Sequence, residues 1–157
     1  LTSGGTGVAP TFQTAAGGGK VLQVQVGTST ATSTQVIATT TYTDIAGMTA
    51  TITPATGSKI LCIWNIDSNR GAGEAWGTKL LRDVTSVWES VDTWSHMAQG
   101  TGSTRIRESF THYDTPTGAN GATAFTYKIQ CGTYSSASEG FNEDGNKTQL
   151  VLIEIGA

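Results

Sequence analysis

From Lys20 onward, apolar and polar residues alternate in short runs with the two-residue period that is typical of β-strands. In the run 20–28, Leu22, Val24 and Val26 fall on one face, and the residues between them are glutamines. The same pattern predicts strands at 20–28, 34–43, 48–54, 59–67, 76–89 (two short strands joined by a turn), 103–114, 122–131 and 148–157.

Turn-forming residues separate these runs. Thr56-Gly57-Ser58 and Asn120-Gly121 favour tight turns, because Gly and Asn tolerate a positive φ angle. Arg82-Asp83 marks the turn within 76–89, the segment 141–147 is predicted as a loop, and 95–99 is ambiguous. Thr, which is β-branched, accounts for 28 of the 157 residues, whereas good helix formers are scarce. We therefore expect an all-β domain, an antiparallel β-sandwich or jelly roll.

Two of the predicted strands, 59–67 and 148–157, are apolar on both faces. In a two-layer sandwich each strand turns one face to the core and the other to solvent. The second apolar face therefore needs another partner, and the simplest one is a second copy of the chain. The pattern predicts an oligomer.

The first 19 residues differ from the rest of the chain. They carry no charge and six glycines, with Val8, Pro10 and Phe12 as the only anchors. Such a segment has too little apolar surface to fold alone. We expect 1–19 to be either a disordered tail or an extended connector packed against neighbouring chains, and 20–157 to be the folded domain.

Charge limits the classes of partner. Only 13% of the residues are charged and the net charge is −3, so we expect no nucleic-acid binding. No apolar run approaches the roughly 20 residues that span a bilayer, so we expect no membrane insertion. The chain opens at Leu1 without a signal peptide, and we expect it to derive from a longer protein.

Cys62 and Cys131 lack a metal-binding spacing and are expected to be buried thiols, with a disulfide as the alternative.

Several segments resemble the C-terminal head of bacteriophage tail-fibre proteins. The opening LTSGGTGVAPTFQ is similar to the connector LTSNGTG-x-APTW that precedes this head, with Phe12 where Trp is common. The resemblance implies a homotrimeric β-sandwich, similar to the jelly rolls of C1q and tumour necrosis factor, at the distal end of a virion fibre. It also implies assembly in the bacterial host cytoplasm beside other virion proteins, and it carries over no catalytic residues. The segments that resemble the head are 19–26, 43–61, 77–83 and 150–155, with 52–61 the most specific.

Motifs for catalysis and cofactors are not found. Gly17-Gly18-Gly19-Lys20 lacks the spacing of a phosphate-binding loop, and no Gly-x-Ser-x-Gly motif occurs. The acidic groups are predicted to be solvated loop residues, with weak calcium or carbohydrate binding as the alternative, and the histidines form a metal site only if their strands adjoin. We expect no enzyme, no cofactor and no metal. The groups considered are Glu139, Glu143 and Asp144; Asp67, Asn69 and Glu74; and His96 with His112.

The tryptophans are the strongest indication of a binding surface. Sugar-binding proteins expose aromatic rings, on which the C–H faces of a pyranose stack, beside charged side chains that bind its hydroxyls. The region 70–96 holds such a mixture, whereas Trp64 lies in the most apolar run and is expected in the core. The alternative is that these rings pack within the head or between subunits. The candidate receptor-binding residues are Trp76, Arg82, Asp83, Trp88 and Trp94.

Three functions follow from these observations. The first is a trimeric tail-fibre head that adheres to a host-surface receptor, a glycan or a protein, without catalysis. The second is a capsid decoration or other virion-stabilising trimer, with 1–19 reaching a neighbour. The third is a capsular depolymerase or esterase, for which the chain is short and lacks a motif.

Overall fold

The computed structural model of the chain describes residues 20–30, 32–70, 75–90, 96–97, 104–133, 138–142 and 147–157. In these ranges all regular structure is β-strand. The strands are β1 (Val21–Thr28), β2 (Gln35–Ile37), β3 (Thr43–Ile52), β4 (Lys59–Arg70), β5 (Ala75–Arg82), β6 (Thr85–Glu89), β7 (His96–Met97), β8 (Thr104–Asp114), β9 (Phe125–Thr133), β10 (Glu139–Phe141) and β11 (Gln149–Ile155). No helix in the described ranges is long and apolar enough to cross a membrane.

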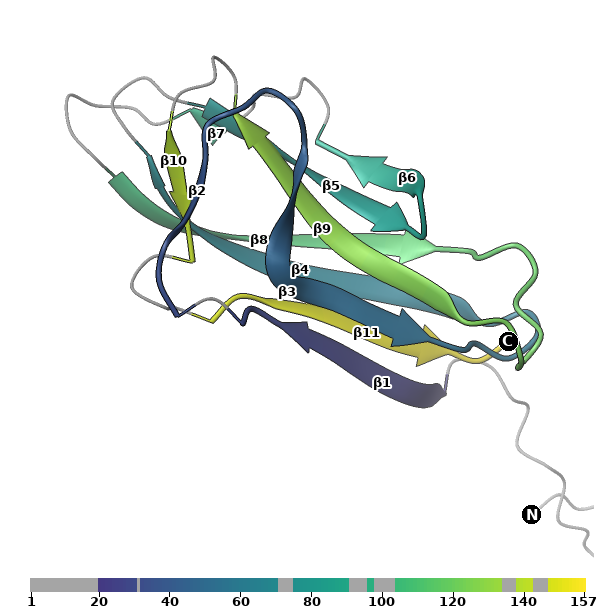
Figure 1. Cartoon of the computed structure of the whole chain (residues 1–157). Coiled ribbons are helices and arrows are strands. Elements are labelled where there is room, and N and C mark those ends of the chain that lie inside the picture. The colour runs from purple at the N-terminus through teal and green to yellow at the C-terminus, as the bar shows by residue number, and fades with distance from the viewer. Residues whose placement is uncertain are drawn as a thin grey trace, which may run out of the picture.

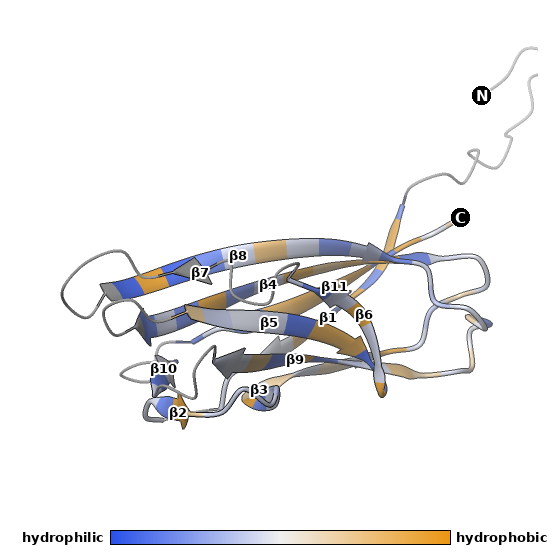
Figure 2. Cartoon of the chain, turned by 90° about the horizontal axis from the view of Figure 1, so that it is seen from above, coloured by the Kyte–Doolittle hydropathy of each residue, from blue (hydrophilic) through white to orange (hydrophobic). Residues whose placement is uncertain are grey.

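The strands form two antiparallel sheets that lie face to face (Figure 1). Sheet I has the order β1-β11-β4, with β8 on the other side of β4 and the short strands β10 and β2 beside the end of β4. Sheet II has the order β3-β9-β5-β6, with β7 beside β5. Figure 2 shows the sheets as separate layers, β8, β4 and β11 over β5, β9 and β3. The first and last strands are neighbours and the chain crosses repeatedly between sheets, so the expected all-β jelly roll is confirmed.

The core lies between the two sheets and is built from the inward residues of each alternating strand. Phe125, Tyr127, Ile129 and Cys131 face inward from β9, as the sequence pattern predicts, and none is more than 7% exposed. Trp64 packs from the opposite sheet, 5.4 Å from Phe110 between ring centres. The buried side chains of both sheets form one continuous cluster. Both cysteines lie in it as free thiols, as expected.

The turns predicted by sequence are also present. Gly57 and Gly121 have positive φ angles, and the Asn120 side chain accepts hydrogen bonds from the backbone N–H groups of Ala122 and Thr123. Asp83, at the tip between β5 and β6, also has a positive φ angle of 55°. The Asp83 turn joins the paired strands β5 and β6, whereas Gly57 and Gly121 lie in the connections from β3 to β4 and from β8 to β9, which cross between the sheets.

Two sequence predictions about strands are wrong. The predicted strand 34–43 is only three residues long as β2, because the chain then turns and crosses the outside of β9, where Thr39 accepts the backbone N–H of Thr133. β3 accordingly begins at Thr43, before the predicted 48. β10 was not predicted at all; it is a short strand held between β2 and β4. Tertiary contacts, absent from a single sequence, decide both cases.

One end of the sandwich carries both ends of the described domain. Lys20 accepts a hydrogen bond from the backbone N–H of Gly156 at 3.0 Å, so β1 starts where β11 finishes (Figure 1). We call this the connector end, because residues 1–19 join the domain there. Residues 1–19 themselves lie outside the described ranges, so the prediction that they form a connector remains a prediction.

Candidate functional site

Of the tryptophans proposed for sugar binding, the two that the structure describes, Trp76 and Trp88, do not form an exposed surface. Trp76 is wholly buried in β5, and its ring meets the edges of Phe110 and Phe141 at 6.3 and 5.4 Å. Trp88 is half-buried in β6, with its ring 5.1 Å from that of Trp64. Trp94 lies outside the described residues. The rings of Trp76 and Trp88 therefore belong to the aromatic core, and within this chain they offer no platform for a sugar.

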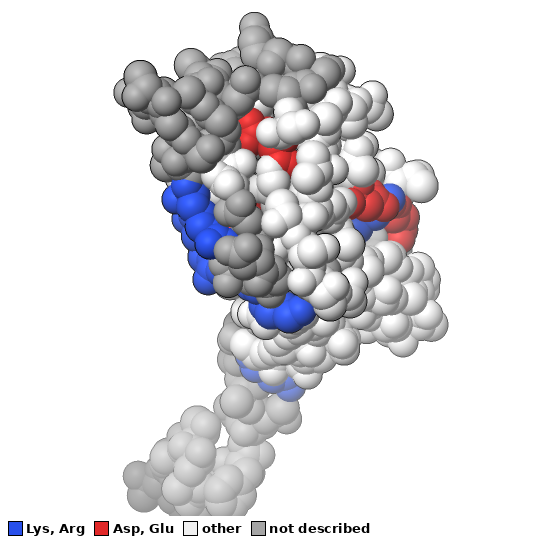
Figure 3. Space-filling view, turned by 60° about the vertical axis from the view of Figure 1, so that its left-hand side comes forward, with Lys and Arg blue, Asp and Glu red and all other residues white. Residues whose placement is uncertain are grey.

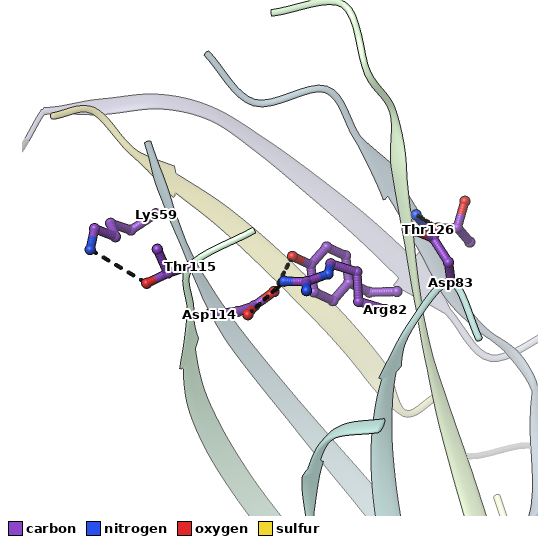
Figure 4. Close-up of polar contacts among 7 residues, drawn as sticks. Lys59, Arg82, Asp83, Asp114, Thr115 and Thr126 are labelled. Atoms are coloured by element: carbon purple, nitrogen blue, oxygen red, sulfur yellow. Dashed lines mark hydrogen bonds and ion pairs between the residues drawn. The ribbon is translucent and has the colours of Figure 1, made fainter. Parts of the chain in front are cut away.

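Arg82 and Asp83 have structural partners. The Asp83 carboxylate accepts the backbone N–H of Thr126, while the Asp83 N–H donates to the Thr126 carbonyl at 2.7 Å. Arg82 donates to both oxygens of Asp114, at 2.9 and 2.6 Å (Figure 4). Both residues thus fasten the β5–β6 turn to its surroundings, and the four described candidates, Trp76, Arg82, Asp83 and Trp88, do not line one exposed site.

Arg82, Asp114 and Tyr127 form a polar cluster that joins the two sheets near the connector end. Asp114 comes from β8 in sheet I and is only 7% exposed, whereas Arg82 and Tyr127 come from sheet II. The Tyr127 hydroxyl donates to Asp114 at 2.6 Å. Burial and this hydrogen bond to the carboxylate raise the pKa of Tyr127. Because each member of the cluster is paired with another, the arrangement acts as a clamp between sheets.

The cysteine, acidic and histidine side chains considered for catalysis or metal binding are buried or half-buried where the structure describes them. Burial, followed by the nearby Asp114 charge, raises the pKa of the Cys62 thiol to about 12, so Cys62 stays protonated at neutral pH. Glu139 was expected in a solvated loop but is fully buried in β10. His112 is half-buried on β8, and the His96 side chain lies outside the described part. Among the described residues, no group of His, Cys, Asp and Glu is arranged to hold a metal ion.

Asp67 and Asn69 were also expected in a solvated loop, and both belong instead to β4. Asp67 is only 4% exposed and forms ion pairs with Arg105 and Arg107 of β8. Glu74, Glu143 and Asp144 lie outside the described residues. The loop interpretation fails here because β4 continues to Arg70, three residues beyond the predicted strand.

The outer face of sheet I is apolar over its connector half. Antiparallel register aligns outward residues into rows across β1, β11, β4 and β8. Val24 and Val26 are 50% and 52% exposed, and the apolar residues beside them are half-buried. We call this surface the apolar face. Its two rows are Val24, Ile153, Leu61 and Tyr113, then Val26, Val151, Ile63 and Thr111.

The outer face of sheet II is polar, in contrast. Thr49 and Thr51 lie outward on β3, and the hydroxyl of Thr51 bonds that of Thr126 at 2.9 Å. Lys128 pairs with Asp44 at 2.9 Å, and Lys79 pairs with Glu89 at 3.2 Å. A surface of this kind is well solvated. The chain therefore has one outer face suited to water and another suited to a partner.

The comparisons with known proteins are distant. No protein-family model and no curated protein sequence matches the chain. Among solved structures it is similar to a chain of infectious bursal disease virus Gx strain, with a TM-score of 0.46 and 18% identity, over 85% of this chain and 38% of that one. A chain of the Gt strain gives 0.44 and 18%, over 87% and 39%. The chain thus spans less than two-fifths of each viral chain, and such low similarity carries no conclusion about function.

Proposed function

We propose that three copies of this chain pack through their apolar faces to form the head of a bacteriophage tail fibre, which adheres to a host-surface receptor without catalysis. The observation that carries the assembly is the apolar face itself. Contiguous exposed apolar surface on a soluble domain marks an interaction site. A sheet that is apolar outside as well as inside needs a second layer, and identical copies supply one most simply.

The fibre assignment rests on the resemblance of the opening and head segments to tail-fibre proteins. The fold is compatible with it, since the β1 start and the β11 end share the connector end. Three connectors would then leave a trimer in one direction, toward the fibre shaft, and the other end would point away. Three weak receptor sites on one head bind together with an avidity that no single site has.

The assembly is tested by the solution mass of the full 157-residue chain, measured by light scattering after size exclusion. We expect about 49 kDa, three times the chain mass of 16.3 kDa. A stable monomer over a wide concentration range would contradict the assembly. It would also leave the exposed valines of β1 without a partner.

Adhesion is tested by competition. Purified head in excess is expected to reduce adsorption of the phage to its host, and an unchanged adsorption rate would remove the receptor-binding role. Labelled antibody against this chain, applied to intact particles, distinguishes a tail-fibre head from a capsid decoration trimer. Signal along the capsid shell, with none on the tail, would replace the fibre assignment by the capsid one.

A further inference from the structure

The connection between β8 and β9, residues 115–124, contains a chemically reactive pair of residues. Of the five asparagines in the chain, only Asn120 is followed by a glycine, and both Asn120 and Gly121 are exposed. Gly121 has a φ angle of 76°, and a Cβ atom added there would have no heavy atom within 4 Å. The pair lies at the connector end (Figure 1) and outside the two rows of the apolar face.

An asparagine that precedes a glycine is able to lose its side-chain amide by reaction with the main chain. The Gly121 nitrogen gives up its proton and bonds to Asn120 Cγ, the Cγ–Nδ2 bond breaks, and the NH2 group takes up a proton and leaves as ammonia. A glycine hinders this ring closure least, since it has no Cβ. Water then opens the five-membered imide at either carbonyl and gives aspartate, or isoaspartate, in which the main chain runs through Cγ.

The fold engages the N–H group that must react. The Gly121 N–H donates to the carbonyl oxygen of Pro54 at 2.9 Å, and Pro54 is buried. A carbonyl does not remove an amide proton, and no ionisable residue occurs in 53–58 or 115–124. Charged side chains gather elsewhere, for example at the end of the sandwich where β8 begins (Figure 3). Removal of the proton is thus left to solvent, after the hydrogen bond to Pro54 has opened.

The Asn120 side chain is also held in place. Its Oδ1 accepts the backbone N–H groups of Ala122 and Thr123 at 2.9 and 2.8 Å. Any rotation that brings Cγ toward the Gly121 nitrogen must weaken these two bonds. Both reacting groups, the nitrogen and the side-chain amide, are therefore fixed by hydrogen bonds in the folded domain.

Glu154 supports the bond to Gly121 from the far side. The peptide group that joins Pro54 to Ala55 accepts the Gly121 N–H at its carbonyl, and its own N–H donates to the buried Glu154 carboxylate at 2.7 Å. A hydrogen bond on the N–H of a peptide group polarises that group and strengthens the bond on its carbonyl. One chain of hydrogen bonds thus runs from β11 through the β3–β4 connection to Gly121.

We propose that Asn120 is a spontaneous deamidation site which the folded domain keeps unreactive, and that isoaspartate forms there only when the contact between residues 53–58 and 115–124 opens. The proposal is independent of the assembly and of the receptor proposed above. Isoaspartate adds one main-chain methylene group and a negative charge to the connection between the sheets. Because the released ammonia is not restored, each modified chain keeps a permanent record that its connector end has opened.

The test compares the full folded chain with the same chain in concentrated urea and with a synthetic peptide of residues 116–125, all at mildly alkaline pH. Peptide mapping by mass spectrometry measures the share of aspartate and isoaspartate at position 120 over time. We expect the peptide and the unfolded chain to react at similar rates, and the folded chain at least about tenfold more slowly, because ring closure must first break hydrogen bonds. A folded chain that reacts as fast as the peptide would overturn the proposal.

Hydrogen exchange, measured by NMR, gives an independent readout. Exchange and ring closure both need the Gly121 amide proton to become accessible to solvent base, so both report the same local opening. We expect the Gly121 amide to exchange at least about tenfold more slowly in the folded chain than in the peptide. A Gly121 amide that exchanges freely in the folded chain would contradict the protection by Pro54.

Glu154→Gln tests the support from Glu154, and Gly27→Ala is its control. The first variant weakens the bond to the Ala55 N–H and leaves Asn120 and Gly121 unchanged. The second disturbs the close approach of β1 to β3, away from this connection. We expect deamidation at Asn120 to be severalfold faster in Glu154→Gln and unchanged in Gly27→Ala, under conditions in which urea unfolding shows both to be folded. An unchanged rate in Glu154→Gln, or equal acceleration in both variants, would contradict an opening at this contact.

Discussion

At the scale of single residues, the fold depends on a few polar side chains that bridge its layers. The ion pair of Arg82 with Asp114 is the clearest, because the Asp114 carboxylate is almost inaccessible and the pair joins the two sheets. Removing one partner leaves a buried charge that neither water nor a cation compensates.

We predict that Arg82→Met lowers the free energy of unfolding by about 2 kcal/mol, a value reduced from that of a fully buried pair because the Arg82 side chain is 20% exposed. Lys79→Met is the matched control, because its partner Glu89 is 38% exposed and such pairs contribute at most about 1 kcal/mol. Urea unfolding of both variants measures the difference. Equal effects would mean that Asp114 is adequately satisfied by Tyr127 alone.

Glu154 provides a second bridge, and its charge makes stability depend on pH. Its carboxylate accepts the Ala55 backbone N–H at 2.7 Å and the Gln23 amide at 2.6 Å. Burial by itself would raise the pKa of Glu154, but hydrogen bonds to the charged form outweigh it and hold the pKa below its ordinary 4.5. A lowered pKa in the folded state means that the stabilisation is present above pH 4.5 and is lost as the pH falls through the folded value.

We therefore expect Glu154→Gln to lower the free energy of unfolding by about 1–2 kcal/mol at pH 7, because the new amide has one acceptor oxygen and cannot accept from both Ala55 and Gln23. At pH 3 the gap between wild type and variant should be smaller than at pH 7, since protonation of the carboxyl in the unfolded state, where its pKa is the ordinary 4.5, removes part of the stabilisation. Urea midpoints at the two pH values measure this. A gap that stays constant, or grows in acid, would show that Glu154 does not titrate as described.

Single residues also show how much of a candidate site can be predicted from the sequence. Trp64 could be assigned to the core from its apolar neighbours alone. Trp76 could not, because Gly77 and Thr78 beside it are small or polar, and these residues are buried by contacts from elsewhere in the chain, such as the Ser90 side chain bonded to the Thr78 N–H. Asp67 was placed in a loop for the same reason: its arginines lie 38 and 40 positions away, and only the pairing of β4 with β8 brings them together.

At the scale of elements, alternating polarity was sufficient to locate the long strands. β1, β4, β8, β9 and β11 all follow the predicted runs within a few residues, because each has one face fixed by the core. The sequence pattern did not reveal the bounds of the short strands β2 and β10, since three residues are too few to show a period. β10 pairs with β4, and β2 pairs with β10. Local pattern thus fixes the strands that build the core, and tertiary contacts fix the ones that cover its end.

β1 and β3 approach each other closely and so close one side of the sandwich. A Cβ atom at Gly27 would lie 2.2 Å from the Thr49 carbonyl oxygen, so β1 must move if any side chain is added. We expect Gly27→Ala to lower the free energy of unfolding by about 2–3 kcal/mol. Gln25→Ala, on the same strand but exposed, should change it by less than about 0.5 kcal/mol. Thermal or urea unfolding measures both, and a neutral Gly27→Ala would mean that the two strands are not in firm contact.

At the scale of the whole molecule, the two outer faces are unlike each other. Sheet II turns threonines and paired charges outward, whereas sheet I turns valine, leucine and isoleucine outward across three strands. A monomer with this asymmetry would expose apolar surface to water for no gain in stability. Packing of identical copies removes the asymmetry, because the apolar faces become interior and the polar faces become the surface of the assembly.

This asymmetry predicts opposite outcomes for equal substitutions on the two faces. Val24→Glu/Val26→Glu places two carboxylates on the apolar face at positions about half exposed in one chain, so the single copy should still fold. Burying those charges between copies is unfavourable, so we expect the mass by light scattering to fall from about 49 kDa to that of one chain. Thr49→Glu/Thr51→Glu makes the matched change on exposed positions of sheet II and should keep the trimeric mass. If both variants stay trimeric with unchanged thermal stability, the copies associate through some surface other than the apolar face.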